Sequence, residues 1–261
     1  MFPFDFNGAA DVVLVDLTTI PDVTGYSVRA GQNQTSEDSG TPLTFVFERN
    51  GSVDRRTTIA FRASGSAKAF SDYQISGADH FDGVTGTVTF EVGQSQVVVQ
   101  VTPVADKLVE ITEDVSFTLA DDVPCFPSDH QASVSILDDD QADFTVTPSR
   151  YAGTVTETGS SLKVFVVLDA RPSANVVLDV ANGDTTEIKV SAKTLTFTPQ
   201  NWNVPQSITL RGVDDRQADG DQQALVAFQI SPLTTDELFK STNWLDLTAV
   251  DILDNGIGHR R

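Results

Sequence analysis

Hydrophobic and polar residues alternate along most of the chain in short runs that are bounded by turn-forming residues. A period of two is the pattern of a half-buried β-strand, and turns every 8–12 residues are typical of antiparallel sandwiches. The dipeptides Asn50-Gly51, Asn182-Gly183 and Asp219-Gly220 tolerate the positive φ that tight turns require. The alternating runs are 43–48, 57–63, 87–92, 97–101, 115–119, 132–137, 162–168, 176–180, 194–198, 207–213, 224–230 and 245–253. This pattern predicts an all-β protein built of antiparallel β-sandwiches.

The runs fall into two successive groups, each with enough strands for a sandwich of its own. We expect a first domain at 22–140 and a second at 141–255, with an N-terminal arm at 1–21 and a C-terminal tail at 256–261. Almost no linker separates the two groups, so the tandem domains should be stiffly coupled.

Two shorter segments complete the predicted elements. Residues 10–17 of the arm can form a strand, which either caps the sheet of the first domain or pairs with the edge of another subunit. The intrachain arrangement is the favoured one. Residues 234–240 are the single segment with a helical pattern, and a Thr or Asp side chain can cap the helix.

The net charge of the chain argues against some classes of binding partner. The 261 residues include 37 Asp and Glu against 17 Lys and Arg, a formal net charge of -20. Such a surface repels phosphate backbones and anionic lipids, so neither nucleic-acid binding nor membrane insertion is expected. No apolar run approaches the length of a membrane span, and the first residues lack a signal-peptide pattern. Cys125 is the single cysteine, which excludes an intrachain disulfide.

The run Asp138-Asp139-Asp140 directly follows an apolar strand. Two carboxylates about 4 Å apart repel each other by roughly 4 kcal/mol at an effective dielectric constant near 20. A solvated acidic turn is one reading of the run. A bound Ca2+, which takes six to eight oxygen ligands from loops, is the other. A similar strand ending at Asp254-Asn255 favours the second reading.

Several segments of the first half resemble, in order, those of the Calx-β domain family. They are the strand and turn at 43–51, the Gly-x-Ala…Asp-Tyr segment at 65–73, the strand at 86–93, the Asp-x-x-x-Glu-x-x-Glu element at 106–113 and the terminal Ile-x-Asp-Asp-Asp at 136–140. The resemblance implies an Ig-like β-sandwich that binds several Ca2+ ions at one end. By matching position, the implied ligands are Glu37, Asp72, Asp106, Glu110, Glu113, Asp138, Asp139 and Asp140.

The second half resembles the same family in the form found in bacterial surface-protein repeats. Glu157 aligns with Glu37, and the run at 195–206 (LTFTPQNWNVPQ) is typical of such repeats. The implied metal ligands are Glu157, Asp184, Asp214, Asp215, Asp219 and Asp254. Asp184 is the expected counterpart of Asp72. The closing Asp254-Asn255-Gly256 offers fewer carboxylates than the first domain, so we expect fewer or weaker ions there.

These features favour a non-catalytic calcium-binding module of an extracellular or cell-surface protein. The expected partners are a surface protein or glycan, or copies of the same chain. The alternative is a subunit of a surface filament, an array or a virion decoration that uses the arm for assembly. An enzyme is not expected, because His80, His130 and His259 are scattered and form no catalytic or zinc-binding spacing.

Overall fold

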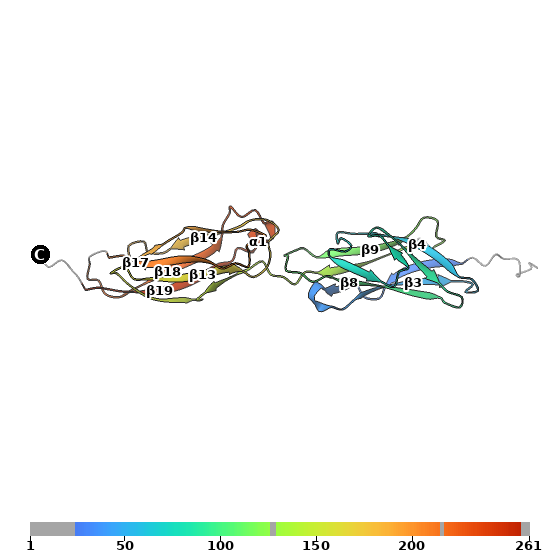
Figure 1. Ribbon diagram of the computed structural model, residues 1–261, viewed down its shortest axis with the longest axis horizontal. Helices are drawn as coiled ribbons and strands as arrows, with labels where there is room; N and C mark the ends of the chain where they lie inside the picture. Colours follow the sequence, from blue (N-terminus) through green and yellow to red (C-terminus); the bar gives the residue numbers. More distant parts are fainter. Residues whose placement is uncertain (1–23, 126–128, 215–216, 257–261) are drawn as a thin grey trace, which may run out of the picture.

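The computed structural model describes residues 24–125, 129–214 and 217–256, which form two β-sandwiches arranged end to end (Figure 1). The predicted all-β class and the antiparallel sandwich architecture are confirmed. The strand predicted at 10–17 and the C-terminal residues from 257 onward lie outside the described residues.

The first sandwich contains two sheets of strands β1 to β10. One sheet has the order β1-β3-β8-β5 and the other the order β2-β10-β9-β4-β7-β6. All neighbours pair antiparallel except β2 and β10, which are parallel. The strands are β1 (Gly25–Ala30), β2 (Gln34–Ser36), β3 (Leu43–Asn50), β4 (Thr57–Ser64), β5 (Tyr73–Ser76), β6 (His80–Phe81), β7 (Thr85–Phe90), β8 (Gln96–Pro103), β9 (Glu113–Leu119) and β10 (Gln131–Leu137).

The second sandwich repeats this plan with strands β11 to β19. Its sheets have the orders β11-β13-β17-β15 and β12-β19-β18-β14-β16, and β12 pairs in parallel with β19 as β2 does with β10. The strands are β11 (Phe144–Thr147), β12 (Tyr151–Thr156), β13 (Ser161–Leu168), β14 (Val176–Asn182), β15 (Ile188–Val190), β16 (Thr194–Phe197), β17 (Gln206–Gly212), β18 (Gln222–Ile230) and β19 (Leu245–Leu253).

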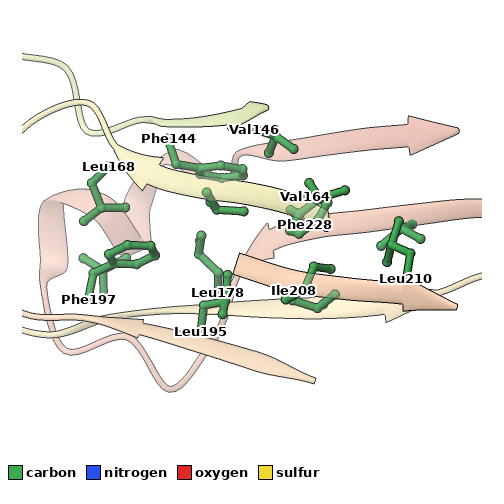
Figure 2. Packing of buried hydrophobic residues seen from close by; sticks show 14 of the residues in the cluster. Phe144, Val146, Val164, Leu168, Leu178, Leu195, Phe197, Ile208, Leu210 and Phe228 are labelled. Atoms are coloured by element: carbon green, nitrogen blue, oxygen red, sulfur yellow. The ribbon is translucent and has the colours of Figure 1, made fainter. Parts of the chain in front are cut away.

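Alternation along the strands places one apolar face of each sheet inside each sandwich. In β18, Ala224, Val226 and Phe228 are buried, whereas Leu225 between them is exposed. Figure 2 shows how Phe228 and its neighbours from the facing sheet fill the core of the second domain. The first core contains more aromatic rings, among them Phe45 stacked on Phe117 at 4.1 Å between ring centroids.

The predicted helix is present as α1 (Glu237–Thr242), one turn later than its sequence pattern begins. The Asp236 side chain caps the helix by accepting bonds from the N–H groups of Leu238 and Phe239. Phe239 is buried in the core, so α1 closes one end of the second sandwich. Within the described ranges, no helix has the length and hydrophobicity needed to cross a bilayer.

The two domains contact each other through a loop of the first domain, in addition to the connection at 138–143. The Val109 N–H donates to the Arg171 carbonyl at 3.0 Å, and the Arg171 N–H donates to the Lys107 carbonyl at 2.6 Å. The Val109 side chain is 7% exposed and belongs to the hydrophobic core of the second domain. One side chain of the first domain is therefore part of the core of the second.

The packing predicts which aromatic residues stabilise the second domain. Phe228 is fully buried, whereas Phe165 of strand β13 in the facing sheet is 43% exposed. We expect Phe228→Ala to lower the free energy of unfolding by about 3–5 kcal/mol, because it removes a buried ring and leaves a cavity. Phe165→Ala should cost far less. Urea denaturation of both variants tests the difference, and equal losses would contradict the core described here.

Candidate metal centre

Four connections of the first domain meet at the end that faces the second domain. Strands β4 and β10 both pair antiparallel to β9, so both end where β9 begins. Strand β2, parallel to β10, ends at the same place. The connection from β8 to β9 necessarily reaches it as well. Since the predicted acidic residues of this domain follow β2, β4, β8 and β10, the topology gathers them at one end, here called the acidic cup.

The centre of the cup is a group of three carboxylates, those of Asp72, Glu110 and Glu113. One oxygen of each lies within 4.8 Å of the other two, and all three side chains are partly buried. Among the described residues of the chain, they are the one group of three His, Cys, Asp or Glu side chains with this geometry.

Local backbone geometry holds Asp72 in this position. The loop before it begins at Gly65, whose φ of 129° suits glycine and whose Cα lies against the Asp114 carbonyl at the start of β9. A Cβ at Gly65 would collide with that carbonyl. The Ala67 N–H donates to the same oxygen at 3.2 Å, and the Lys68 N–H donates to Asp72 Oδ2 at 2.6 Å. The loop is thereby fixed against β9.

The remaining acids of the cup surround this group and are bonded to its loops. Glu37 Oε1 accepts a bond from the Asp106 N–H at 2.9 Å. Asp138 Oδ2 accepts one from the Glu110 N–H at 2.8 Å, and Asp138 Oδ1 accepts one from the Asp140 N–H at 3.0 Å. These bonds tie the end of β10 to the loop between β8 and β9.

Burial among like charges changes the pKa values of these groups. The pKa of Glu37 is raised to about 7, mainly by burial and also by the neighbouring carboxylates of Asp106, Asp138 and Glu110, against the lowering effect of the Asp106 N–H. Burial, with the charge of Asp72, also raises the pKa of Glu113 to about 7. The pKa of Glu110 is raised for the same two reasons. Protons therefore occupy part of the cup near neutral pH when no cation does.

Two lysines lie beside the acids, and sequence reasoning assigned neither a role. Lys107 Nζ is 3.0 Å from Asp140 Oδ1 and 3.5 Å from Asp38 Oδ2. The positive charge of Lys68 lowers the pKa values of Glu110 and Glu113, although burial outweighs it. Both lysines lie in loops rich in acidic residues, and this was the feature of the sequence that could have indicated their place beside the carboxylates. The Lys107 side chain is 54% exposed. Exposed ion pairs contribute about 0–1 kcal/mol each, which is too little to offset the repulsion among the carboxylates of the cup.

Asp139 occupies the rim of the cup. Its side chain is exposed and accepts a bond from the Asp38 N–H at 3.3 Å. The other seven predicted positions of the first domain lie around the cup, although Asp106 is exposed as Asp139 is. The seven are Glu37, Asp72, Asp106, Glu110, Glu113, Asp138 and Asp140.

The second domain has a related but poorer arrangement at its far end. Glu157 follows β12 as Glu37 follows β2, and it is 1% exposed. Asp254 follows β19 as Asp138 follows β10, and its two oxygens accept bonds from the Gly220 and Gly256 N–H groups at 2.9 and 2.7 Å.

Other positions of the second domain carry no carboxylate where the first domain has one. Gln222, the first residue of β18, occupies the place of Glu113 at the start of β9. Gly220 donates to Asp254 as Glu110 donates to Asp138, so it stands in the place of Glu110. These replacements remove two of the three central carboxylates.

The expected counterpart of Asp72 has a different position. Asp184 is bonded to its own turn, where its Oδ1 accepts from the Thr186 N–H at 2.9 Å. Glu187 directly precedes β15, as Asp72 directly precedes β5, and it is 6% exposed. Glu187 is therefore the positional counterpart of Asp72, which the sequence did not reveal. Asp214 and Asp219 are exposed, and Asp215 lies outside the described residues.

The donor set of the first-domain cup fits Ca2+ rather than a softer metal. It consists of carboxylate oxygens on several loops, without a histidine or a cysteine in the central group. Hard cations that accept six to eight oxygens prefer such ligands, whereas zinc prefers nitrogen and sulfur. The raised pKa values are consistent with a cavity whose charges lack compensation.

No family model and no curated protein matches the chain. Similar solved structures include the crystal structure of CBD12 from CALX1.2, with 18% identity over 87% of this chain and 99% of that chain and a TM-score of 0.36. The calcium binding domain CBD12 of CALX1.1 covers 85% of this chain and 98% of its own length, with 18% identity and a TM-score of 0.38. The apo-form Calx CBD1 domain covers 44% of this chain and 99% of its own length, with 21% identity and a TM-score of 0.33.

These structural neighbours are Calx-β domains, the family that the sequence motifs resemble. The TM-scores are below 0.5, and the two-sandwich fold is established by the strand pairing of this chain itself.

The raised pKa values predict how stability depends on pH in calcium-free buffer. Between pH 4.5 and about 7, folded Glu37 and Glu113 keep protons that the unfolded chain has lost. The folded state then binds more protons, so the free energy of unfolding should fall as pH rises through this range. Chemical denaturation at several pH values measures the slope.

Glu113→Gln should flatten this slope. Glu91→Gln, which changes a carboxylate 62% exposed outside the cup, serves as the matched control and should leave the slope unchanged. A slope that is the same in all three proteins would contradict the assignment of the pKa shift to the cup.

Proposed function

We propose that the chain is a non-catalytic calcium-binding structural or adhesive module of an extracellular or surface protein. The observation that supports this proposal is the acidic cup, in which three central carboxylates lie within 4.8 Å of one another. The nearby ammonium groups belong to Lys107 and Lys68, which are both exposed. Ca2+ in the cup would be held by Asp72, Glu110 and Glu113, with Glu37, Asp106, Asp138 and Asp140 as further oxygen donors.

The energetic role of the ion follows from the repulsion it removes. Two carboxylates about 4 Å apart repel each other by roughly 4 kcal/mol at an effective dielectric constant near 20. The protein keeps these groups together through the backbone bonds to Asp72 and Asp138. A divalent cation converts the repulsion into attraction, and because it binds the folded cup it stabilises the folded state.

The position of the cup links the ion to the junction between the domains. The loop that supplies Asp106, Glu110 and Glu113 also carries Val109, whose N–H and side chain contact the second domain. An ion that fixes the ligands of this loop also fixes Val109. We therefore infer that Ca2+ stiffens the tandem and holds the two sandwiches in line.

Location and partners follow from this role. Sites of the extracellular type have Kd values of about 10⁻⁴–10⁻³ M, which suit millimolar Ca2+ outside cells. A stiff spacer of net charge -20 suits a surface assembly whose partners are a surface protein or glycan, or copies of the chain. What supports the non-catalytic part of the proposal is that His80 lies exposed on the edge strand β6 and is not part of the central acidic group.

Thermal unfolding with and without Ca2+ tests the proposal. At ten times Kd, binding adds about 1.4 kcal/mol of stability. For a domain of this size that corresponds to an increase in Tm of about 4–8 °C. We expect this increase in 10 mM CaCl2 relative to EDTA, and a much smaller one in MgCl2. An increase below about 2 °C would contradict the proposal.

Two variants locate the effect. Asp72→Asn together with Glu113→Gln should abolish the Ca2+-dependent increase in Tm, because the change removes two of the three central carboxylates. Glu91→Gln removes one exposed carboxylate outside the cup and should retain the full increase. If the cup variant retained it too, the ion would bind elsewhere.

A further inference from the structure

A groove lies at the end of the first domain that is remote from the acidic cup. Its volume is about 650 Å³, and it is lined by β1, by the first half of β4 and by the chain that follows β9. The apolar part of its wall comes from Tyr26, Ile59 and Val123, which are all buried. Thr58 and Pro124 complete that part of the wall.

The groove runs along a backbone edge beside which the described residues place no strand. Residues Thr57–Ala60 of β4 pair with β7 on one side. On the other side, the ladder with β9 ends at Phe61, paired with Leu119. The Ala120 N–H then donates to the Ala60 carbonyl at 3.0 Å, the last bond from this side among the described residues. Because successive residues of a strand point their amides to opposite sides, the N–H and C=O of Thr58 face the groove.

The corresponding end of the second domain is closed. In β14 the Val177 carbonyl accepts a bond from the Ser231 N–H at 2.8 Å. Just before β14, the Asn175 carbonyl accepts one from the Thr235 N–H at 2.9 Å. The segment 231–242, which includes α1, thus continues the hydrogen bonding beyond the end of β18.

Val177 and Ala60 occupy equivalent positions, because each accepts the first bond beyond its paired ladder. Thr58, two residues before Ala60, is then the counterpart of Asn175. The first domain has the same backbone edge as the second but does not have the segment that covers it within its described residues.

The N-terminal arm has the length and pattern to supply the missing cover. The described chain begins at Thr24, which itself lines the groove. The alternation of the arm sequence is such that a strand at 13–17 would place Val13, Val15 and Leu17 on one face and Asp16 on the other. The six residues 18–23 can span up to about 20 Å, and they include a Pro21-Asp22 pair suited to a turn.

The direction of the chain also fits. Strand β1 runs from this end of the domain toward the cup, so a preceding strand that turns at 18–23 would run the opposite way. It would then lie antiparallel to β4, as β9 does. Such a strand would lie beside β4 at the position where β9 no longer pairs with it.

We propose that residues 13–17 of the arm form a short strand in the groove of their own chain, hydrogen-bonded to Thr58. Val13, Val15 and Leu17 face Ile59, Tyr26 and Val123. The short tether gives the arm an effective concentration in the millimolar range at its own groove. This inference does not depend on the calcium proposal, since the groove and the cup lie at opposite ends of the domain.

Cys125 provides a probe beside the groove without any substitution. It is exposed, it is the single cysteine of the chain, and its backbone forms a bridge with Tyr26. With a nitroxide on Cys125 of the full ¹⁵N-labelled chain, the amide signals of residues 13–17 should be broadened relative to a reduced, diamagnetic sample. A mixture of ¹⁵N chains without nitroxide and unlabelled chains with nitroxide should show no broadening.

Two further outcomes overturn the proposal. Broadening that appears in the mixed sample as strongly as in the single-chain sample would place the arm in the groove of a second copy. Unbroadened arm signals in both samples would show that the arm does not occupy the groove.

Hydrogen exchange at the Thr58 amide gives an independent readout in matched variants. Val15→Asp puts a charge on the inward face and should speed exchange of the Thr58 amide roughly tenfold, the net worth of one or two backbone hydrogen bonds. Leu14→Asp makes the same change one residue earlier, on the outward face, and should leave the exchange rate unchanged. Equal rates in the native chain and the Val15→Asp variant would overturn the proposal.

Discussion

The repulsion among the carboxylates of the cup is the constraint on which the rest of the first domain depends. Strand pairing, antiparallel except between β2 and β10, brings the ends of β2, β4, β8 and β10 together, and each end is followed by acidic residues. The fold keeps them in place through backbone donors, as in the bonds that Asp138 and Glu37 accept. Burial and repulsion together raise the pKa of Glu37 and of Glu113 to about 7. In the calcium-free domain, the charged forms of these carboxylates are therefore unfavourable.

The fold could be predicted from the sequence because its strands face water on one side. A half-buried strand such as β18 alternates visibly, and the turn dipeptides mark where strands end. The gathering of the acidic residues of the first domain was predictable for a related reason: motifs in a fixed order indicated the loops, and the topology brings those loops together. Asp139 was the exception, since adjacent residues at a strand end point in different directions.

The second domain shows where sequence reasoning fails. Asp184 and Glu187 are three residues apart in one polar turn, and the difference between them depends on where β15 begins. A three-residue strand has too short a pattern to be located by alternation. The sequence shows Lys107 in an acidic loop but not its contacts with Asp140 and Asp38, because the direction of a lysine side chain depends on neighbours from other loops. Strand register and side-chain direction depend on tertiary packing, so neither can be predicted from the spacing of residues in the sequence.

The place of Val109 bears on how the tandem can be divided. A cut at the end of β10 separates two complete sets of strands, yet it does not separate two complete cores. The second sandwich, produced by itself, would lack the side chain that fills its near end and the carbonyl that Arg171 binds. It would present an opened apolar surface to water. Its folding is therefore tied to a loop translated before it, and the order of synthesis along the chain matches the order in which the two cores can be completed.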